Sequence, residues 1–159
     1  MIQIIQEPIK DFEGADVCCL PADASGLPAI EVCPDIEGLL SRKVKSEAKE
    51  SCNELQPVSG DIIATGAGAL DTGLLVHMVV HQQPGELIRH SNLARALETV
   101  VDFCETEGFE DAGITFITNE TLGLTALDAA ALYNVYLEAS TVRFFVADPD
   151  QLWPEAPTV

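Results

Sequence analysis

Two short apolar runs constrain the fold of this chain more than any other feature. Residues 17–20 form one run, and residues 74–80 form the other, interrupted only at His77. Runs of about four to eight apolar residues without polar alternation are typical of strands covered on both faces. Neither approaches the roughly 18 residues that a membrane-spanning helix needs. The sequence therefore predicts a sheet buried between other elements.

Four more strands are expected, at residues 2–6, 62–65, 114–117 and 142–147. The turn at residues 66–73 lies between two strand patterns, so its glycines predict a hairpin rather than a dinucleotide-binding loop. A long loop is expected at residues 21–34, because four Pro and Gly residues interrupt any regular element there. Six strands are thus predicted in all.

Two helices follow from apolar periodicity. The first is expected to begin at Asp35 and to bury residues that recur every fourth position: Ile36, Leu40, Val44 and Ala48. The second has an apolar stripe from Leu93 to Cys104, and Gly108 is its expected end.

A third helix is expected after Thr125, whose hydroxyl fits an N-cap. Leu127, Ala131 and Val135 are predicted to be its inward face. Strands that alternate with helices in this order predict an α/β fold, with a mixed sheet flanked by helices.

The charge of the chain excludes one large class of partners. Its 159 residues carry 26 acidic and 8 basic side chains, a formal net charge of −18. Such a surface repels nucleic acid and anionic membranes, so neither is expected as a partner. Solubility or adaptation to high salt explains the acidity, and a partner that seeks an acidic surface is the alternative. Half of the basic residues lie at positions 42–49, where a solvated helix face with Glu47 and Glu50 as local partners is expected.

The cysteines and histidines indicate a reduced protein without a metal site. Five cysteines are present, an odd number, and none forms a C-x-x-C pair. We expect buried, reduced thiols, with Cys18 and Cys19 on opposite faces of one strand. The three histidines are too scattered to complete a metal site, and no cofactor is expected. The amino-terminal residues lack the pattern of a signal peptide, so a cytoplasmic location is expected.

Four segments in order resemble the macro domain, the family known for binding ADP-ribose. They are residues 16–23, 60–70, 76–80 and 121–130. The resemblance implies a three-layer α/β/α fold with a mixed six-stranded sheet over residues 1–148. Residues 149–159 would be a C-terminal tail, anchored by Trp153. The partner implied is a nucleotide-like small molecule, and a homo-oligomer is left open.

The chain departs from the macro domain where the ligand would be held. The adenine-binding Asp of the family aligns near Glu7-Pro8, and its last motif Asn aligns with Asp23. Its glycine-rich phosphate loop is replaced by residues 32–35, in which Pro34 lacks an N–H and Asp35 adds a negative charge. Glu120 stands where the second phosphate loop has glycine. Asp23, Asp35 and Glu120 are expected on one rim, where they would oppose a diphosphate.

The resemblance also names the candidate site residues. The ligand contacts it implies are Ala22, Asp23, Pro34, Asp35, Asn119, Glu120, Thr121, Leu122 and Gly123. Asp23 is the candidate catalytic residue, as a general base for water, and the alternative is an Asx-turn that begins the loop. His77 is expected to be a hydrogen-bonded core residue, with His81 and His90 on the surface.

Three functions remain open on the sequence alone. The first is a nucleotide- or ADP-ribose-type binding module with weakened or lost diphosphate binding. The second is a noncatalytic structural or interaction domain. The third is an ADP-ribosyl hydrolase that uses Asp23. The hydrolase is the least favoured of the three, and the fold by itself cannot assign a function.

Overall fold

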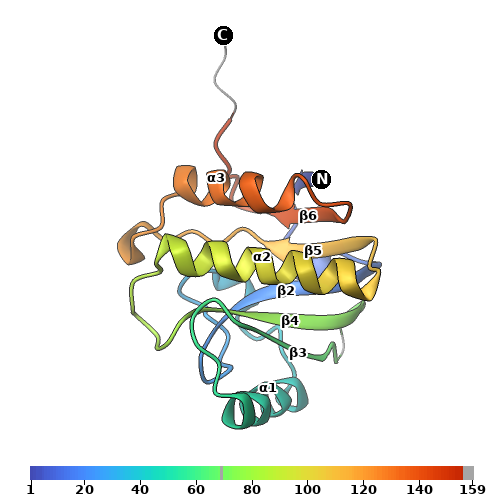
Figure 1. The fold of residues 1–159 in the computed structure, drawn as a ribbon, viewed down its shortest axis with the longest axis vertical. Helices are drawn as coiled ribbons and strands as arrows, with labels where there is room; N and C mark the ends of the chain where they lie inside the picture. The colour runs from blue at the N-terminus through green and yellow to red at the C-terminus, as the bar shows by residue number, and fades with distance from the viewer. Residues whose placement is uncertain (69, 156–159) are drawn as a thin grey trace.

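A single mixed sheet forms the middle of the molecule, with helices on either side (Figure 1). The computed structural model describes residues 1–68 and 70–155, so Ala69 of the predicted turn and positions 156–159 of the predicted tail lie outside it. The six strands lie in the order β1-β6-β5-β2-β4-β3. All neighbours are parallel except β3 and β4, which form the predicted antiparallel hairpin. The three-layer α/β/α fold with a mixed six-stranded sheet is therefore confirmed.

The strands lie close to their predicted positions. They are β1 (Ile2–Ile5), β2 (Ala15–Asp23), β3 (Ile62–Gly66), β4 (Thr72–His81), β5 (Asp111–Thr115) and β6 (Arg143–Ala147). The largest shifts are of three residues: β2 ends three residues after its predicted end, and β5 begins three residues before its predicted start. The side chain of Arg143 in β6 binds that of Asp111 there, with Nε 2.8 Å from Oδ1. A cross-strand ion pair thus lies where the sequence offered no apolar signal.

The centre of the sheet is β2, which is buried on both faces as predicted. Cys19 belongs to the larger buried cluster on one face, and Cys18 belongs to the smaller cluster on the other. The prediction that Pro21 opens a loop is wrong, because β2 continues through Asp23. Pro21 pairs in register with Met78, and the strand becomes irregular immediately after, between Ala22 and Asp23. One missing N–H is tolerated next to such an irregularity.

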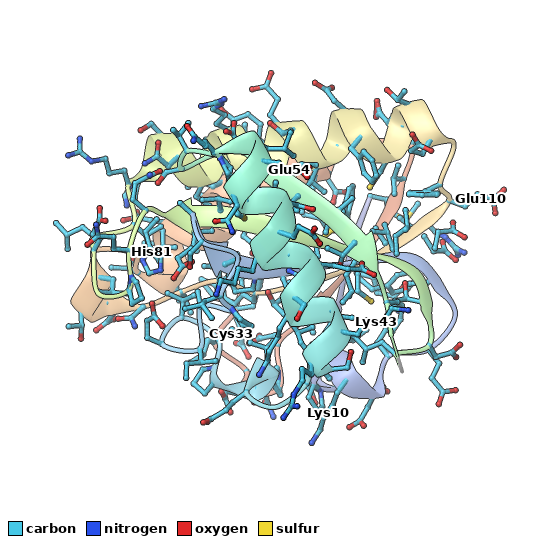
Figure 2. All side chains as sticks on the ribbon, turned by 90° about the horizontal axis from the view of Figure 1, so that it is seen from below. Lys10, Cys33, Lys43, Glu54, His81 and Glu110 are labelled. Atoms are coloured by element: carbon cyan, nitrogen blue, oxygen red, sulfur yellow. The ribbon has the colours of Figure 1, made fainter. Side chains whose placement is uncertain are left out.

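Helices α2 (His90–Glu107) and α3 (Ala126–Leu137) cover one face of the sheet (Figure 1). Helix α1 (Arg42–Leu55) packs beside β3 and, with the short 3₁₀ helices η1 (Ile9–Asp11) and η2 (Pro34–Ile36), closes the other face. Figure 2 views the molecule from below, with α1 crossing the foreground. Gly108 ends α2 in the left-handed conformation, as predicted.

Two predictions about the helices are wrong. Helix α1 begins at Arg42 after the N-cap Ser41, not at Asp35, because Gly38 takes a left-handed φ of 74° that no helix interior tolerates. In α3 the predicted inward residues point to solvent, and Leu127 and Val135 are 69% and 68% exposed. The buried face is instead Ala129, Ala130, Tyr133 and Leu137. This helix is apolar around most of its circumference, so periodicity alone could not select its buried face.

The five cysteines are buried and free, as predicted. Trp153 packs against the rings of Phe116 and Tyr133, with centroids 4.9 and 6.1 Å away, so it anchors the residues that follow β6. Within residues 1–68 and 70–155, no helix combines the length and the hydrophobicity needed to cross a bilayer.

Candidate functional site

The carboxyl ends of five parallel strands meet at one edge of the sheet. The central strand β2 has β4 as its neighbour on one side and β5 on the other, so the chain crosses from one side of β2 to the other between β4 and β5. Between β2 and β5 the strand order therefore reverses, and in open α/β sheets ligands bind in the crevice outside such a point. Two loops border it: residues 24–33 after β2, called here the β2 loop, and residues 116–125 after β5, called the β5 loop.

The centre of this crevice is filled by the protein itself. Ala29 and Val32 of the β2 loop and Ile117 and Leu122 of the β5 loop are buried in one cluster. The side chain of Asn119 joins the loops, since its Nδ2 donates to the Glu31 carbonyl at 2.7 Å and its Oδ1 accepts from the Leu122 N–H at 3.1 Å. Two hollows border the β2 loop at this edge, and Phe116 and Thr118 of the β5 loop also line one of them.

An acidic hollow of about 260 Å³ lies on one side of the β2 loop. Four acidic residues line it, Glu31, Asp35, Asp148 and Asp150, with Phe116 among the apolar residues. Among the residues that the structure describes, no lysine or arginine lines this hollow. Partial burial, and then repulsion by Asp150, raises the pKa of Asp35, although the positive charge of Lys10 opposes the change. The electrostatic environment is thus unfavourable to another anion.

The acidic hollow contains one potential nucleophile, the thiol of Cys33. Burial raises its pKa to about 12, and the neighbouring charge of Asp35 adds to the shift. The thiolate is the nucleophilic form of cysteine. Cys33 is therefore a protonated, inert wall residue at neutral pH.

A second space, called the loop hollow, measures about 410 Å³ and lies against the other side of the β2 loop. Asp23 lines it, together with Glu31, Glu37 and Lys45. The buried carboxylate of Asp23 folds back on its own loop, where Oδ1 accepts from the Ser25 N–H at 2.8 Å, the Ser25 hydroxyl at 2.6 Å and the Leu27 N–H at 3.2 Å. The Asx-turn interpretation of Asp23 is therefore confirmed.

His81 holds the β2 loop to the end of β4. It was predicted on the surface, which is wrong, because it is only 1% exposed. Its Nδ1 lies 3.2 Å from the Glu86 carbonyl and its Nε2 lies 3.0 Å from Oε1 of Glu31. Neither of these two buried atoms has a hydrogen-bond partner among the described residues, so the contact is a close approach of a potential ion pair. His90 is half exposed, as predicted.

The predicted ligand residues are dispersed in the structure. Pro34 and Asp35 line the acidic hollow, and Asp23 lines the loop hollow. Neither hollow is lined by Ala22, Asn119, Glu120, Thr121, Leu122 or Gly123. Asp23 and Asp35 line different hollows and Glu120 lines neither, so the expectation that the three share one rim stays a prediction. Their roles in ligand binding stay predictions.

Sequence reasoning missed Asp148 and Asp150 as site residues. Both oxygens of Asp148 are used, because Oδ1 accepts from the Leu152 N–H and Oδ2 from the Trp153 N–H, each at 2.9 Å. These two acids directly follow β6, a parallel strand that ends at the crevice edge. Their position after a predicted strand was the available signal, since functional side chains gather at such ends.

The chain is similar to solved structures, although the sequence comparisons found no match. No protein-family model and no curated protein matches the chain. Among solved structures, the Thermus aquaticus DarG macrodomain superposes with a TM-score of 0.78 at 13% identity, covering 94% of this chain and 99% of its own. A mutant Oceanobacillus iheyensis macrodomain with ADP-ribose has a TM-score of 0.76 at 18% identity, covering 96% and 87%.

A Trypanosoma brucei macrodomain in complex with ADP is similar as well, with a TM-score of 0.70 at 14% identity over 96% of this chain and 66% of its own. These identities are too low to transfer a function, but the superpositions extend over nearly the whole chain. The strand order and these likenesses together show that the chain has the macrodomain fold.

Proposed function

We propose that this chain is a noncatalytic small-molecule-binding module whose acidic hollow takes the uncharged, nucleoside-like part of a ligand and disfavours a diphosphate. The observation that carries the proposal is the set of four acidic residues, Glu31, Asp35, Asp148 and Asp150, with no basic residue among the described residues that line the hollow. Macrodomains of similar structure with ADP or ADP-ribose bound support a nucleotide-type ligand.

Electrostatics argues against a diphosphate in this hollow. Two like unit charges 4 Å apart cost roughly 4 kcal/mol at an effective dielectric constant of 20, which is about a thousandfold in affinity. Solvent at the open side reduces this cost without changing its sign. Four carboxylates therefore outweigh the contribution that a few backbone N–H groups would make to phosphate binding.

Size and wall chemistry favour part of a nucleotide over a whole one. The hollow measures about 260 Å³, below the roughly 300–1,000 Å³ usual for drug-sized ligands. Phe116, Val32 and Leu152 provide apolar surface for a ring, and the carboxylates can accept hydrogen bonds from amino and hydroxyl groups. A nucleoside offers both kinds of group without negative charge.

Calorimetric titration with adenosine, ADP-ribose and ADP at moderate ionic strength tests the proposal. We expect adenosine to bind at least as tightly as ADP-ribose, and ADP to bind most weakly because it carries the most charge. Uptake of ADP-ribose with a Kd below about 100 μM, and at least about tenfold tighter than adenosine, would overturn the proposal.

A charge-neutral variant gives a matched test of the carboxylates. Asp150→Asn should raise the affinity for ADP-ribose by about tenfold, because it removes one repulsive charge and some of the repulsion on Asp35. Glu107→Gln removes the same charge at the exposed end of α2 and should change the affinity less than about twofold. Equal effects of the two variants would show that only net charge matters.

An interaction domain without a small-molecule ligand is the second candidate. The filled crevice centre and the Asn119–Glu31 link favour it, because both occupy the place where a ligand would cross between the loops. Absence of heat with all three compounds at millimolar concentration would support it over the binding module. The hydrolase hypothesis is tested by release of ADP-ribosyl groups from a modified substrate, with Asp23→Asn as the control that keeps the oxygen acceptor of the turn.

A further inference from the structure

A third hollow, distinct from the acidic hollow, concentrates positive charge in a strongly negative chain. It measures about 260 Å³ and lies between residues 25–27 of the β2 loop and one side of α1. Arg42, Lys45 and Lys49 line it, three of only eight basic residues against 26 acidic ones. We call it the basic hollow.

The positions of these three cations destabilise helix α1. Arg42, Lys45 and Lys49 follow one another at spacings of three and four residues, so they share one face and repel one another. Arg42 and Lys45 also lie in the first turn of α1, which contains no acidic residue. The amino-terminal end of a helix has a positive dipole, so cations there are unfavourable. A bound anion would relieve both effects.

Glu47 and Glu50 were expected as local acidic partners for these cations, but Glu47 bonds outside the helix. Glu47 Oε2 accepts from the Gly66 N–H at 3.2 Å instead. Across residues 1–68 and 70–155, the arginine ion pairs are Arg95–Asp61 and Arg143–Asp111, and none of the cations of the basic hollow forms one. The three positive charges therefore remain available to a ligand.

The wall opposite the cations is formed by the β2 loop, which packs closely against α1 at Gly26. Gly26 has a φ of 89°, and a Cβ on it would lie 2.9 Å from the backbone of Ala48 in α1. The β2 loop therefore packs directly on the helix between Lys45 and Lys49. Ser25 and Ser46 add hydroxyl groups to the lining.

The basic hollow adjoins the loop hollow across an exposed leucine. Leu27 and Lys45 line both the basic hollow and the loop hollow, so the two spaces adjoin. The side chain of Leu27 is 55% exposed, which leaves apolar surface beside the positive charges. A ligand that is anionic at one end and apolar at the other would match this arrangement.

We propose that the basic hollow binds the phosphate group of a small organic phosphate monoester, with the organic part of the ligand over Leu27 toward the loop hollow. A doubly charged phosphate matches three clustered cations better than a single carboxylate does. A nucleic acid is a poor match, because a net charge of −18 repels a long polyanion while a compact phosphate meets only the local field. The proposal is independent of the function proposed for the acidic hollow.

The test titrates the full chain with phenyl phosphate or inorganic phosphate and measures NMR chemical shifts of the backbone amides. Phenyl phosphate should shift amides of residues 25–27 and 42–49 and bind more tightly than inorganic phosphate. Lys45→Gln and Lys49→Gln should each weaken its binding by about tenfold. Lys43→Gln is the matched control, because Lys43 lies on the same helix but outside the lining and its loss changes the net charge equally (Figure 2). It should change the affinity less than about twofold.

Leu27→Ala separates the two parts of the proposal. It should remove the preference for phenyl phosphate over inorganic phosphate and leave the affinity for inorganic phosphate unchanged. Equal weakening by Lys43→Gln and Lys45→Gln, shifts at other residues, or no saturation by either probe would overturn the site. Unchanged preference in Leu27→Ala would overturn the placement of the organic part. All four variants alter exposed side chains, and equal thermal unfolding midpoints would exclude misfolding as the cause.

Discussion

His77 shows how a buried titratable residue is built into the core of this molecule. It lies in the middle of β4, only 1% exposed, with its Nε2 2.8 Å from the Thr65 hydroxyl of β3. Burial lowers its pKa from 6.5 to about 4, and the nearby charge of Glu47 only partly opposes this. The hydrogen-bonded core role predicted from the sequence is confirmed, and the imidazole is neutral at physiological pH.

The lowered pKa of His77 predicts a loss of stability in acid. Since the unfolded chain binds the proton more readily than the folded one, stability falls as the pH drops from about 6.5 toward 4, by at most ~3 kcal/mol from this residue. Urea unfolding at pH 7 and pH 4.5 measures the effect. His77→Gln lacks the titrating group, so its stability should change less between the two pH values. An equal change in both proteins would contradict the prediction.

Removing the hydroxyl of Tyr133 should lower stability more than removing the hydroxyl of Tyr136 on the same helix. Its buried hydroxyl donates to the Thr115 carbonyl at 2.6 Å and accepts from the Ile117 N–H at 3.0 Å, so it satisfies two backbone groups at the end of β5. Tyr133→Phe should lower the free energy of unfolding by about 1–3 kcal/mol, because both groups lose their partner. Tyr136→Phe, on the partly exposed side of α3, should cost less than about 0.5 kcal/mol in the same urea titration.

At the scale of elements, the β2 loop contributes lining residues to the acidic hollow, the loop hollow and the basic hollow. Residues 29–33 separate the acidic hollow from the loop hollow, and residues 25–27 form one wall of the basic hollow. The loop is held at three places: to α1 through Gly26, to β4 through Glu31 and His81, and to the β5 loop through Asn119. A preformed loop of this kind reduces the entropy lost when a ligand binds.

Gly26→Ala should therefore destabilise the protein more than Gly85→Ala. Both Gly26 and Gly85 have left-handed φ angles, 89° and 85°, but only at Gly26 does a Cβ meet backbone atoms within 3 Å. Gly85→Ala should cost about 1 kcal/mol from backbone strain alone, and Gly26→Ala at least about 1–3 kcal/mol more. Urea unfolding of the two variants compares them directly. Equal costs would show that the loop does not rest on α1 in solution.

At the scale of the whole molecule, negative charge opposes compaction. A net charge of −18 makes the folded chain repel itself, and only two arginine–carboxylate pairs offset it among the described residues. These pairs are exposed, so they contribute little. Screening by salt should weaken repulsion among many charges more than it weakens these few attractions.

The melting temperature should therefore rise with ionic strength. Raising NaCl from 0.1 to 1 M shortens the Debye length from about 10 to 3 Å, and a gain of about 1–2 kcal/mol would raise Tm by roughly 3–6 °C. Differential scanning calorimetry at pH 7 measures this. At pH 5, closer to the pI of about 4.2, the salt effect should be smaller. A fall in Tm with salt at pH 7 would show that attractive pairs dominate.

How far the sequence predicts this molecule depends on whether a feature is local. The strands, the hairpin, the Asx-turn at Asp23 and the caps at Thr125 and Gly108 depend on residues close together in the chain, and they were predicted correctly. The inward face of α3 was not, because Leu127 and Tyr133 are both apolar enough to be buried. Which of them faces the sheet is decided by the partners of the Tyr133 hydroxyl at the end of β5, which lie in another element.

The candidate sites divide in the same way. The sequence by itself determined that Pro34 lacks an N–H donor and that Asp35 carries a negative charge, because residue type fixes charge and hydrogen-bonding capacity. Only the tertiary structure decided that Asp35 meets Asp148 and Asp150, that Asp23 turns into its own loop, and that Arg42, Lys45 and Lys49 face a hollow. The reason is that parallel strands bring together loops more than 100 residues apart, and the spacing of residues along the chain does not encode that proximity.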